Sequence, residues 1–243
     1  MVVTMLVMTG TGTGVGKTIT TAAIAALAVA GGQRAAVLKP AQTGVRPDEP
    51  GDLQDVVRLA GPEVTTRELR RYPDPLSPEA AARRSGLPAL DPGEIAQAAS
   101  DLDTGHDLTL IEGAGGLLVR FNGTGASLAD VAWSLGSLVI IVAEAGLGTL
   151  NATALTAEVA TRRGLTVAGV IIGAWPAEPD LAALSNLEDL PVAAGAPLLG
   201  VLPADIGQSS REDFLAAARA GLSPWFGGEF DPELFAGWAS AGK

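Results

Sequence analysis

The sequence predicts an α/β fold: a doubly wound, mostly parallel sheet flanked by helices. Apolar runs of strand length alternate with helical patterns along the 243 residues, as in parallel sheets whose strands are connected by helices. The apolar residues are mainly Ala, Val, Leu and Ile, and aromatics make up only 4%, which suits helices packed on such a sheet. A glycine-rich loop follows the first apolar run, so ligands are expected at the carboxyl ends of the strands.

Six apolar runs predict the strands. They cover residues 2–8, 35–39, 107–112, 137–143, 167–172 and 198–202. The second of these strands is expected to end where Lys39 meets Pro40, because proline cannot continue a central ladder. Residues 40–51 then form a loop, since prolines and glycines are frequent there.

Helical patterns fill most of the intervals between these strands. They cover about residues 17–30, 52–60, 78–85, 92–102, 149–163, 179–188 and 210–220. Ser127 and Asp130 have the spacing of a capping box, so a short helix is expected after glycine-rich 113–125. No repeat or boundary divides the chain, so residues 1–243 are expected to form one domain, with about 224–243 as a C-terminal extension or docked helix.

Charge and composition exclude several classes of function. The formal net charge is −11 without any cluster of Lys or Arg, which argues against nucleic acid and membrane surfaces as partners. The absence of cysteine excludes disulfides and a cysteine nucleophile and is compatible with the cytoplasm, where we expect the protein. No apolar run reaches the roughly 18 residues of a membrane span, and the N-terminus lacks the basic start of a signal peptide.

The glycine-rich loop has the residues of a phosphate-binding P-loop. Residues 10–18 read Gly-Thr-Gly-Thr-Gly-Val-Gly-Lys-Thr. Glycines let backbone N–H groups point at phosphate oxygens, and the following helix N-terminus adds its dipole. Lys17 is expected to reach the β- and γ-phosphates, and the Thr18 hydroxyl to coordinate Mg2+. Thr11 stands where the usual motif has glycine, so this loop is one residue longer.

Five further blocks of sequence accompany the longer loop. They are Lys-Pro-Ala-Gln-Thr-Gly at 39–44, Asp-Leu at 52–53, Glu-Gly-Ala-Gly-Gly at 112–116, Leu-Gly-Thr-Leu-Asn at 147–151 and Pro-Leu-Leu-Gly-Val-Leu-Pro at 197–203. In this order, and over residues 4 to about 205, they resemble the dethiobiotin synthetase family. The P-loop alone is shared by many enzymes, but its combination with the first and third blocks is much more specific.

The resemblance implies an enzyme that converts diaminopelargonate, CO2 and ATP into dethiobiotin, ADP and phosphate, a step of biotin biosynthesis. One amine captures CO2 as a carbamate, whose oxygen attacks the γ-phosphorus to give a carbamic-phosphoric anhydride. The second amine closes the cyclic urea and expels phosphate. The resemblance also implies a requirement for Mg2+ and a homodimer whose substrate site lies at the subunit interface.

Lys39 and Lys17 are the catalytic residues that the resemblance implies. Lys39 would hold the carbamate and neutralise charge that develops during phosphoryl transfer. Free N–H groups at the start of the helix near 149 would hold the substrate carboxylate of the neighbouring subunit. The full set of expected substrate contacts is Thr11, Lys39, Thr43, Gly148, Thr149, Leu150 and Asn151.

Asp52 and Glu112, with Thr18, are the expected Mg2+ ligands, because Mg2+ takes few protein carboxylates together with phosphate oxygens and water. Glu112 follows a predicted buried strand, where an unpaired charge would be costly. Three other acids near Asp52 leave its assignment open: Asp48, Glu49 and Asp55.

The nucleotide contacts are expected from the P-loop, the segment after the third predicted strand, and two later strand ends. They are Gly14, Val15, Gly16, Lys17, Thr18, Ile19, Glu112, Gly113, Ala114, Gly115, Gly173, Ala174, Pro203, Ala204 and Asp205. Many family members place Asn and Asp after the strand at 167–172, where the Asn amide pairs with adenine. Here residues 173–176 read Gly-Ala-Trp-Pro, so we expect loose nucleotide selectivity, with other triphosphates accepted alongside ATP.

Two other functions are compatible with a P-loop. A partition- or cell-division-type ATPase switch usually has a second lysine early in the loop, and residues 10–16 contain none. An amide-forming synthetase that draws ammonia from a glutaminase domain would need a cysteine nucleophile. His106, the sole histidine, has no acid–base partner nearby in the sequence and is expected at the surface.

Overall fold

The computed structural model describes residues 4–241. Within them the strands form one seven-stranded sheet of order β3-β2-β4-β1-β5-β6-β7, and every neighbouring pair is parallel. The strands are β1 (Met5–Gly10), β2 (Ala35–Thr43), β3 (Thr65–Tyr72), β4 (Leu108–Gly116), β5 (Leu138–Ala143), β6 (Val167–Trp175) and β7 (Leu198–Pro203).

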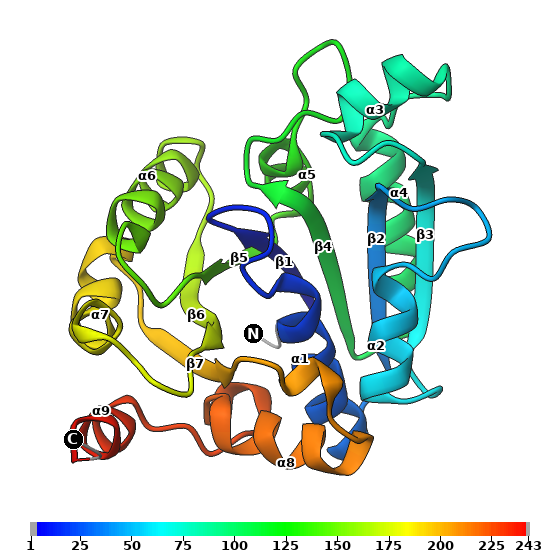
Figure 1. Ribbon diagram of the computed structural model, residues 1–243. Coiled ribbons are helices and arrows are strands. Elements are labelled where there is room, and N and C mark those ends of the chain that lie inside the picture. Colours follow the sequence, from blue (N-terminus) through cyan, green and yellow to red (C-terminus); the bar gives the residue numbers. More distant parts are fainter. Residues whose placement is uncertain (1–3, 242–243) are drawn as a thin grey trace.

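Helices cover both faces of this sheet, as Figure 1 shows. They are α1 (Lys17–Ala30), α2 (Asp52–Ala60), α3 (Pro78–Ser85), α4 (Pro92–Asp103), α5 (Leu128–Leu135), α6 (Thr149–Arg162), α7 (Leu181–Ala194), α8 (Arg211–Gly221) and α9 (Pro232–Ala241), with 3-10 turns η1 (Ile206–Gln208) and η2 (Pro224–Phe226).

Two apolar cores lie on the two faces of the sheet. One core contains residues of α1, α2 and α8, and the other contains residues of α3 to α7 and α9. Neighbouring residues of β1 divide between them: Val7 enters one core, while Leu6 and Met8 enter the other. Strands buried on both faces give continuous apolar runs instead of alternation, so the predicted doubly wound parallel fold is confirmed.

Several strands extend further than the sequence predicts, most of all β2, β4 and β6. β2 continues past 39, and β4 and β6 continue past 112 and 172. The predicted stop at Pro40 was wrong because β2 pairs with β4 only as far as Leu38. Beyond that point β2 has one neighbour, β3, and the pairing passes over the proline. A strand with one free side tolerates the missing N–H.

The edge strand β3 was missed in the sequence. Its residues read Thr-Thr-Arg-Glu-Leu-Arg-Arg-Tyr, with no apolar run. The charged side chains form ion pairs, among them Arg71 with Glu68 and Arg70 with Glu94. Charges on an edge strand are typical because they prevent pairing with other chains, and the same charges conceal the strand from a pattern of hydrophobicity.

The helix predicted after residue 126 is present as α5, and the C-terminal part of the described chain contains η2 and α9. The Ser127 backbone N–H donates to Asp130 Oδ2 at 2.7 Å at the start of α5, as a capping box requires. In α9, the Phe235 ring packs edge-on against Trp175, with 5.4 Å between the ring centroids, and it also contacts Phe230. Among the described residues no helix is both long and apolar enough to cross a membrane.

We predict that Phe235→Ala lowers the free energy of unfolding by about 2 kcal/mol, below the 3–5 kcal/mol of a fully buried Phe, because α9 loses its main ring contacts. Leu234→Ala is the matched control, since Leu234 is 75% exposed on the same helix. Urea denaturation measures both. Equal losses for the two variants would contradict the assignment of Phe235 as the residue that docks α9.

Candidate active site

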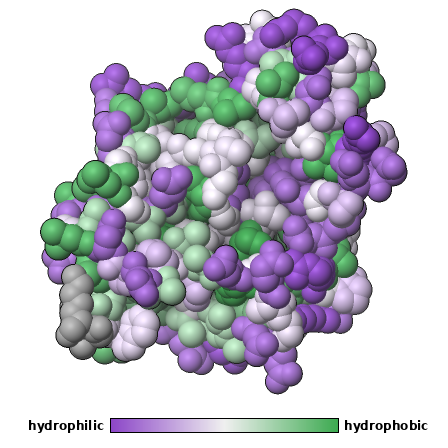
Figure 2. Space-filling model, viewed as in Figure 1, coloured by the Kyte–Doolittle hydropathy of each residue, from purple (hydrophilic) through white to green (hydrophobic). Residues whose placement is uncertain are grey.

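A pocket of about 600 Å³ lies at the carboxyl ends of β1, β2 and β4. Figure 2 shows it as a hollow with hydrophilic atoms in its depth. Its lining residues are Thr13, Gly14, Gly16, Lys17, Thr18, Ile19, Lys39, Ala41, Gln42, Thr43, Asp52, Pro75, Leu76, Ser77, Pro78, Glu112, Gly113, Ala114, Gly115 and Val119. Residues from most of the predicted sequence blocks therefore meet in one cavity.

The glycine-rich loop forms one wall of the pocket. Gly14 and Gly16 have φ angles of 81° and 92°, a region that glycine enters readily and other residues rarely. No side chain caps the start of α1, so its first N–H groups remain free to bind an anion. The Lys17 ammonium donates to the Gly12 carbonyl at 3.1 Å. The arrangement offers backbone donors and a cation to a phosphate group.

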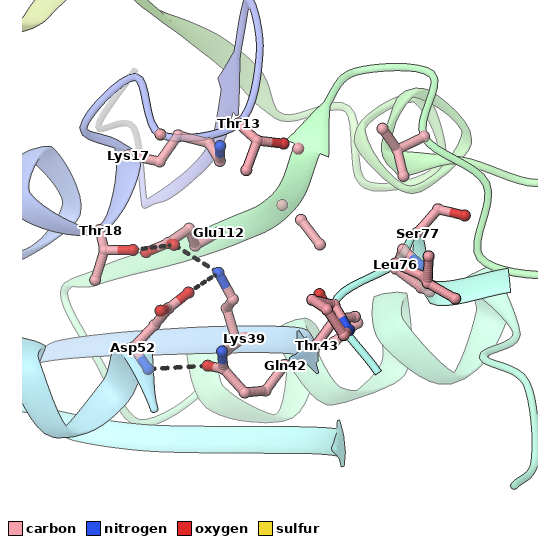
Figure 3. Close-up of a pocket in the computed structure, with 18 of the residues that line it drawn as sticks. Thr13, Lys17, Thr18, Lys39, Gln42, Thr43, Asp52, Leu76, Ser77 and Glu112 are labelled. Carbon is pink, nitrogen blue, oxygen red and sulfur yellow. Dashed lines mark hydrogen bonds and ion pairs between the residues drawn. The ribbon is translucent and has the colours of Figure 1, made fainter. Parts of the chain in front are cut away.

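Lys39 lies between two carboxylates at the floor of the pocket (Figure 3). Its Nζ is 2.7 Å from Glu112 Oε1 and also contacts Asp52 Oδ2. The Thr18 hydroxyl donates to the same Glu112 oxygen at 2.7 Å. Glu112 is fully buried and Lys39 is 3% exposed, so the pair needs this mutual compensation.

These charges set the protonation of the two lysines. Burial disfavours the charged form of Lys39, but Glu112 and Asp52 outweigh it and hold its pKa above the ordinary value. Burial lowers the pKa of Lys17, and Glu112 acts against this effect. Both influences follow the usual rules for buried groups and nearby charges. Lys39 therefore stays a cation, and an anionic ligand beside Lys17 would favour the charged form of that lysine.

The oxygen atoms of Thr18, Asp52 and Glu112 fit the requirements of Mg2+. The second carboxylate oxygen of Glu112, Oε2, is buried and accepts no hydrogen bond from the described residues, and a hard cation would satisfy it. Residues 4–241 contain no group of three or more acidic or histidine side chains that could hold a metal alone.

The structure separates Asp52 from the other acids near it in the sequence. Asp52 lines the pocket, whereas Asp55 pairs with Arg58 on the surface of α2. Asp48 and Glu49 are exposed in the loop after β2. Of these four acids, only Asp52 is therefore in a position to bind the same cation as Glu112.

The pocket also has an apolar wall that the sequence did not reveal. Pro75, Leu76 and Val119 line it, next to the hydroxyl-bearing Thr43 and Ser77. Segment 73–77 is an irregular connection, and nothing in its composition distinguishes it from an ordinary loop. Gln42 was also missed as a site residue, although it stands inside the Lys-Pro-x-x-Thr-Gly block.

The other predicted nucleotide contacts lie outside the residues that line this pocket. Val15 is buried beneath the P-loop. A Cβ added to Gly16 would strike the Gly173 carbonyl, so the end of β6, which continues into Ala174, packs directly on the loop. The Ala204 N–H donates to the Trp175 carbonyl at 2.7 Å. The end of β7 at Pro203, with Ala204 and Asp205 directly after it, is therefore tied to the end of β6.

The predicted substrate contacts are divided between two places. Lys39 and Thr43 line the pocket, whereas Gly148, Thr149, Leu150 and Asn151 are at the start of α6, outside it. Thr11 also falls outside the lining, and its N–H donates to the Val142 carbonyl.

His106 is partly buried in the turn after α4 and shares hydrogen bonds with Thr65 and the Leu102 carbonyl. It is remote from the charged cluster and joins α4 to β3.

An all-parallel sheet whose first strand leads through a glycine loop into a lysine-headed helix defines a P-loop nucleotide-binding protein. A family profile described as an AAA domain matches residues 4–210. The ATP-dependent dethiobiotin synthetase BioD of Streptomyces avermitilis is 58% identical over 95% of this chain and 97% of its own length. The BioD of Saccharopolyspora erythraea is 57% identical over 93% and 98%. The chain belongs to the ATP-dependent dethiobiotin synthetase family.

Solved structures share the fold at much lower identity. The cell division ATPase MinD of Pyrococcus furiosus matches with a TM-score of 0.54 and 18% identity, over 99% of this chain and 98% of MinD. FtsY of Mycoplasma mycoides matches with a TM-score of 0.57 and 16% identity, over 99% and 68%. At these identities the likeness concerns the fold alone.

We predict that Gly173→Ala weakens nucleotide binding at least about tenfold, equivalent to about 1.4 kcal/mol. The new methyl group would overlap the Val15 carbonyl oxygen and lie 2.7 Å from the Val142 side chain, so the P-loop would have to move. Gly123→Ala is the matched control, because no atom lies within 4 Å of its added Cβ. Calorimetric titration with ADP measures both variants, and unchanged affinity in Gly173→Ala would contradict the close packing of β6 on the loop.

Proposed function

We propose that this enzyme is an ATP-dependent dethiobiotin synthetase. It joins CO2 to 7,8-diaminopelargonate, closes the cyclic urea of dethiobiotin and releases ADP and phosphate. The observation that carries the proposal is the position of Lys39. It contacts Asp52 and Glu112 in a pocket that extends from the P-loop to an apolar wall. This arrangement provides one cation between a phosphate-binding end and an end suited to an alkyl diamine.

The reaction divides among the residues of the pocket. Lys17 and the start of α1 bind the β- and γ-phosphates of ATP. Thr18, Asp52 and Glu112 would hold Mg2+, which would neutralise charge on those phosphates. Lys39 then binds the carbamate that forms from one substrate amine and CO2. It orients the carbamate oxygen toward the γ-phosphorus.

Charge must be neutralised as the γ-phosphoryl group passes to the carbamate oxygen and ADP leaves. Lys39 and Lys17 supply fixed positive charge at that point, where it stabilises the transition state more than the ground state. The second amine attacks the carbamic-phosphoric anhydride at its carbonyl carbon, the C–O bond to phosphate breaks, and the urea ring closes. Thr43 offers a hydroxyl to the amine end, and Pro75, Leu76 and Val119 surround the alkyl chain.

A homodimer with the substrate site at the subunit interface belongs to the same proposal. Residues 148–151 lie outside the pocket of their own chain, so a substrate role for them requires the pocket of a second copy. Leu147 is 92% exposed and Leu155 is 56% exposed on the same part of the surface as the start of α6. Figure 2 shows hydrophobic atoms along this margin, over α6 and α7 of Figure 1. We infer a single-domain enzyme that works in the cytoplasm, because its substrates are small metabolites and its chain has no cysteine.

The switch ATPase remains the alternative from another class. A switch of this kind would hydrolyse ATP without a diamine, and the MinD likeness concerns the fold alone. The charged cluster and the apolar wall favour the ligase.

The first test measures phosphate release by the purified protein. We expect release to need diaminopelargonate, bicarbonate and Mg2+ together, because the carbamate is the phosphoryl acceptor. Omitting one component at a time provides the controls. Hydrolysis that runs equally fast without the diamine would contradict the proposal and favour the switch.

Lys39→Met should lower kcat by at least roughly 10²-fold, the cost of removing one positioned transition-state donor. Methionine replaces the aliphatic part of the lysine side chain and removes the ammonium group with its charge. His106→Ala is the control, because His106 is remote from the pocket. Binding of ADP to both variants verifies that the P-loop is intact. Full activity in Lys39→Met would refute the role of Lys39 and leave nucleotide binding unaffected.

Nucleotide selectivity should be loose. The end of β6 presents Gly173 and Ala174, and the Trp175 side chain is buried against Phe235, so no side-chain amide is available there to read the base. We expect CTP, GTP and UTP to support turnover with kcat/KM within about 10²-fold of ATP, since a site without polar readout discriminates little. A stronger preference for ATP would mean that backbone groups near Ala204 read the base.

A further inference from the structure

The first turn of α2 carries Asp52 into the pocket, and its N-cap residue has no side chain that could accept a hydrogen bond. This residue is Gly51. The Asp52 N–H instead donates to the side chain of Gln42, at 2.9 Å from Oε1. Figure 3 shows this bond beside the contact between Lys39 and Asp52. A residue of β2 therefore caps a helix that begins ten positions later.

Gln42 is held in one place by its surroundings. It is 4% exposed, and a Cβ on Gly51 would come within 2.8 Å of its Oε1 and 3.0 Å of Arg71. Arg71 is fixed in turn by two bonds of 2.8 Å to Glu68 and by bonds to the Arg46 and Glu49 carbonyls. A side chain at position 51 would therefore have to displace the Gln42 amide and the Arg71 guanidinium, which meet at the helix start.

The hydrogen bond from the Asp52 N–H to Gln42 connects β2, which carries the cation of Lys39, to α2, which carries the carboxylate of Asp52. Lys39 and Gln42 both belong to β2, while Asp52 is the first residue of α2. Fixing the Asp52 backbone to Gln42 sets where its carboxylate can lie relative to Lys39 and to Glu112. Without that acceptor, the start of α2 keeps the exposed bond from the Gly51 N–H to the Gln54 side chain and the bond from the Gln54 N–H to the Gly51 carbonyl, and neither of them involves β2.

We propose that Gln42 is a positioning residue for the metal site: its amide oxygen holds Asp52 where the carboxylate serves, with Thr18 and Glu112, as a ligand of Mg2+. This inference rests on the proposed function for the metal role of Asp52. Partners that orient a metal ligand typically change metal affinity roughly 10- to 100-fold when removed. Gln42 therefore acts through Asp52 and needs no contact with substrate.

The test separates metal positioning from simple helix capping. Gln42→Met keeps the length of the side chain and removes the acceptor oxygen. The matched control is Gln54→Met, which removes the 2.7 Å bond to the Gly51 N–H at the same helix start but lies outside the pocket. The full-length protein is titrated with Mn2+ in the presence of saturating ADP, and free Mn2+ is followed by electron paramagnetic resonance. Thermal unfolding of each variant is measured alongside.

We expect Gln42→Met to raise the Kd for Mn2+ by at least about tenfold, the lower end of the usual range, while Gln54→Met leaves it unchanged. Unchanged affinity in Gln42→Met, or an equal loss in Gln54→Met, would overturn the proposal. If Gln42→Met does not fold, Gln42→Asn supplies the same comparison, because it withdraws the acceptor by one methylene. No diamine is present, so a failure of diamine-dependent turnover would refute the proposed reaction without affecting this result.

Discussion

The pocket depends on one lysine that is shared between two carboxylates. Lys39 and Glu112 are almost wholly removed from solvent, and the Asp52 side chain is 33% exposed. Isolated charges in such a place would cost several kcal/mol each, so they are tolerated only in contact with one another. The three residues come from β2, β4 and α2, so the contacts that neutralise their charges also fix the relative positions of these elements. The same atoms that neutralise each other in the free protein are those that the proposed reaction uses.

The order of the strands in the sheet brings Lys39, Glu112 and the P-loop to one place. β4 lies between β2 and β1, and the P-loop follows β1. Since all the strands are parallel, the ends that carry Lys39, Glu112 and Thr13 to Thr18 open on one edge of the sheet, as sites in open α/β sheets do. Gly173 then brings β6 onto the P-loop from the other side. The long strands β2 and β4 extend the site beyond the point where their central pairing stops.

Much of this arrangement was predictable from the sequence, and the remainder has physical reasons. The apolar runs located six strands because both faces of the sheet are buried, and the glycine-rich loop located Lys17 and Thr18. β3 was missed because an edge strand can be charged. The end of β2 was placed too early because β2 has a neighbour on only one side at Pro40, so the N–H that proline lacks is not needed for pairing. The Asp-Leu block at 52–53 pointed to Asp52 among four acids, whereas the apolar wall at Leu76 and the cap from Gln42 depend on distant segments meeting, which local patterns do not encode.

The most direct test of the shared-lysine account is a double-mutant cycle on unfolding free energy. It compares Lys39→Met, Glu112→Gln and the variant with both changes, each measured by urea denaturation. Removing one partner of a buried pair costs roughly 3–5 kcal/mol, since the other is left uncompensated. The account predicts that the double variant loses less than the sum of the single losses, with a coupling of about 1–3 kcal/mol. Additive losses would show that Lys39 and Glu112 do not stabilise each other and would contradict it.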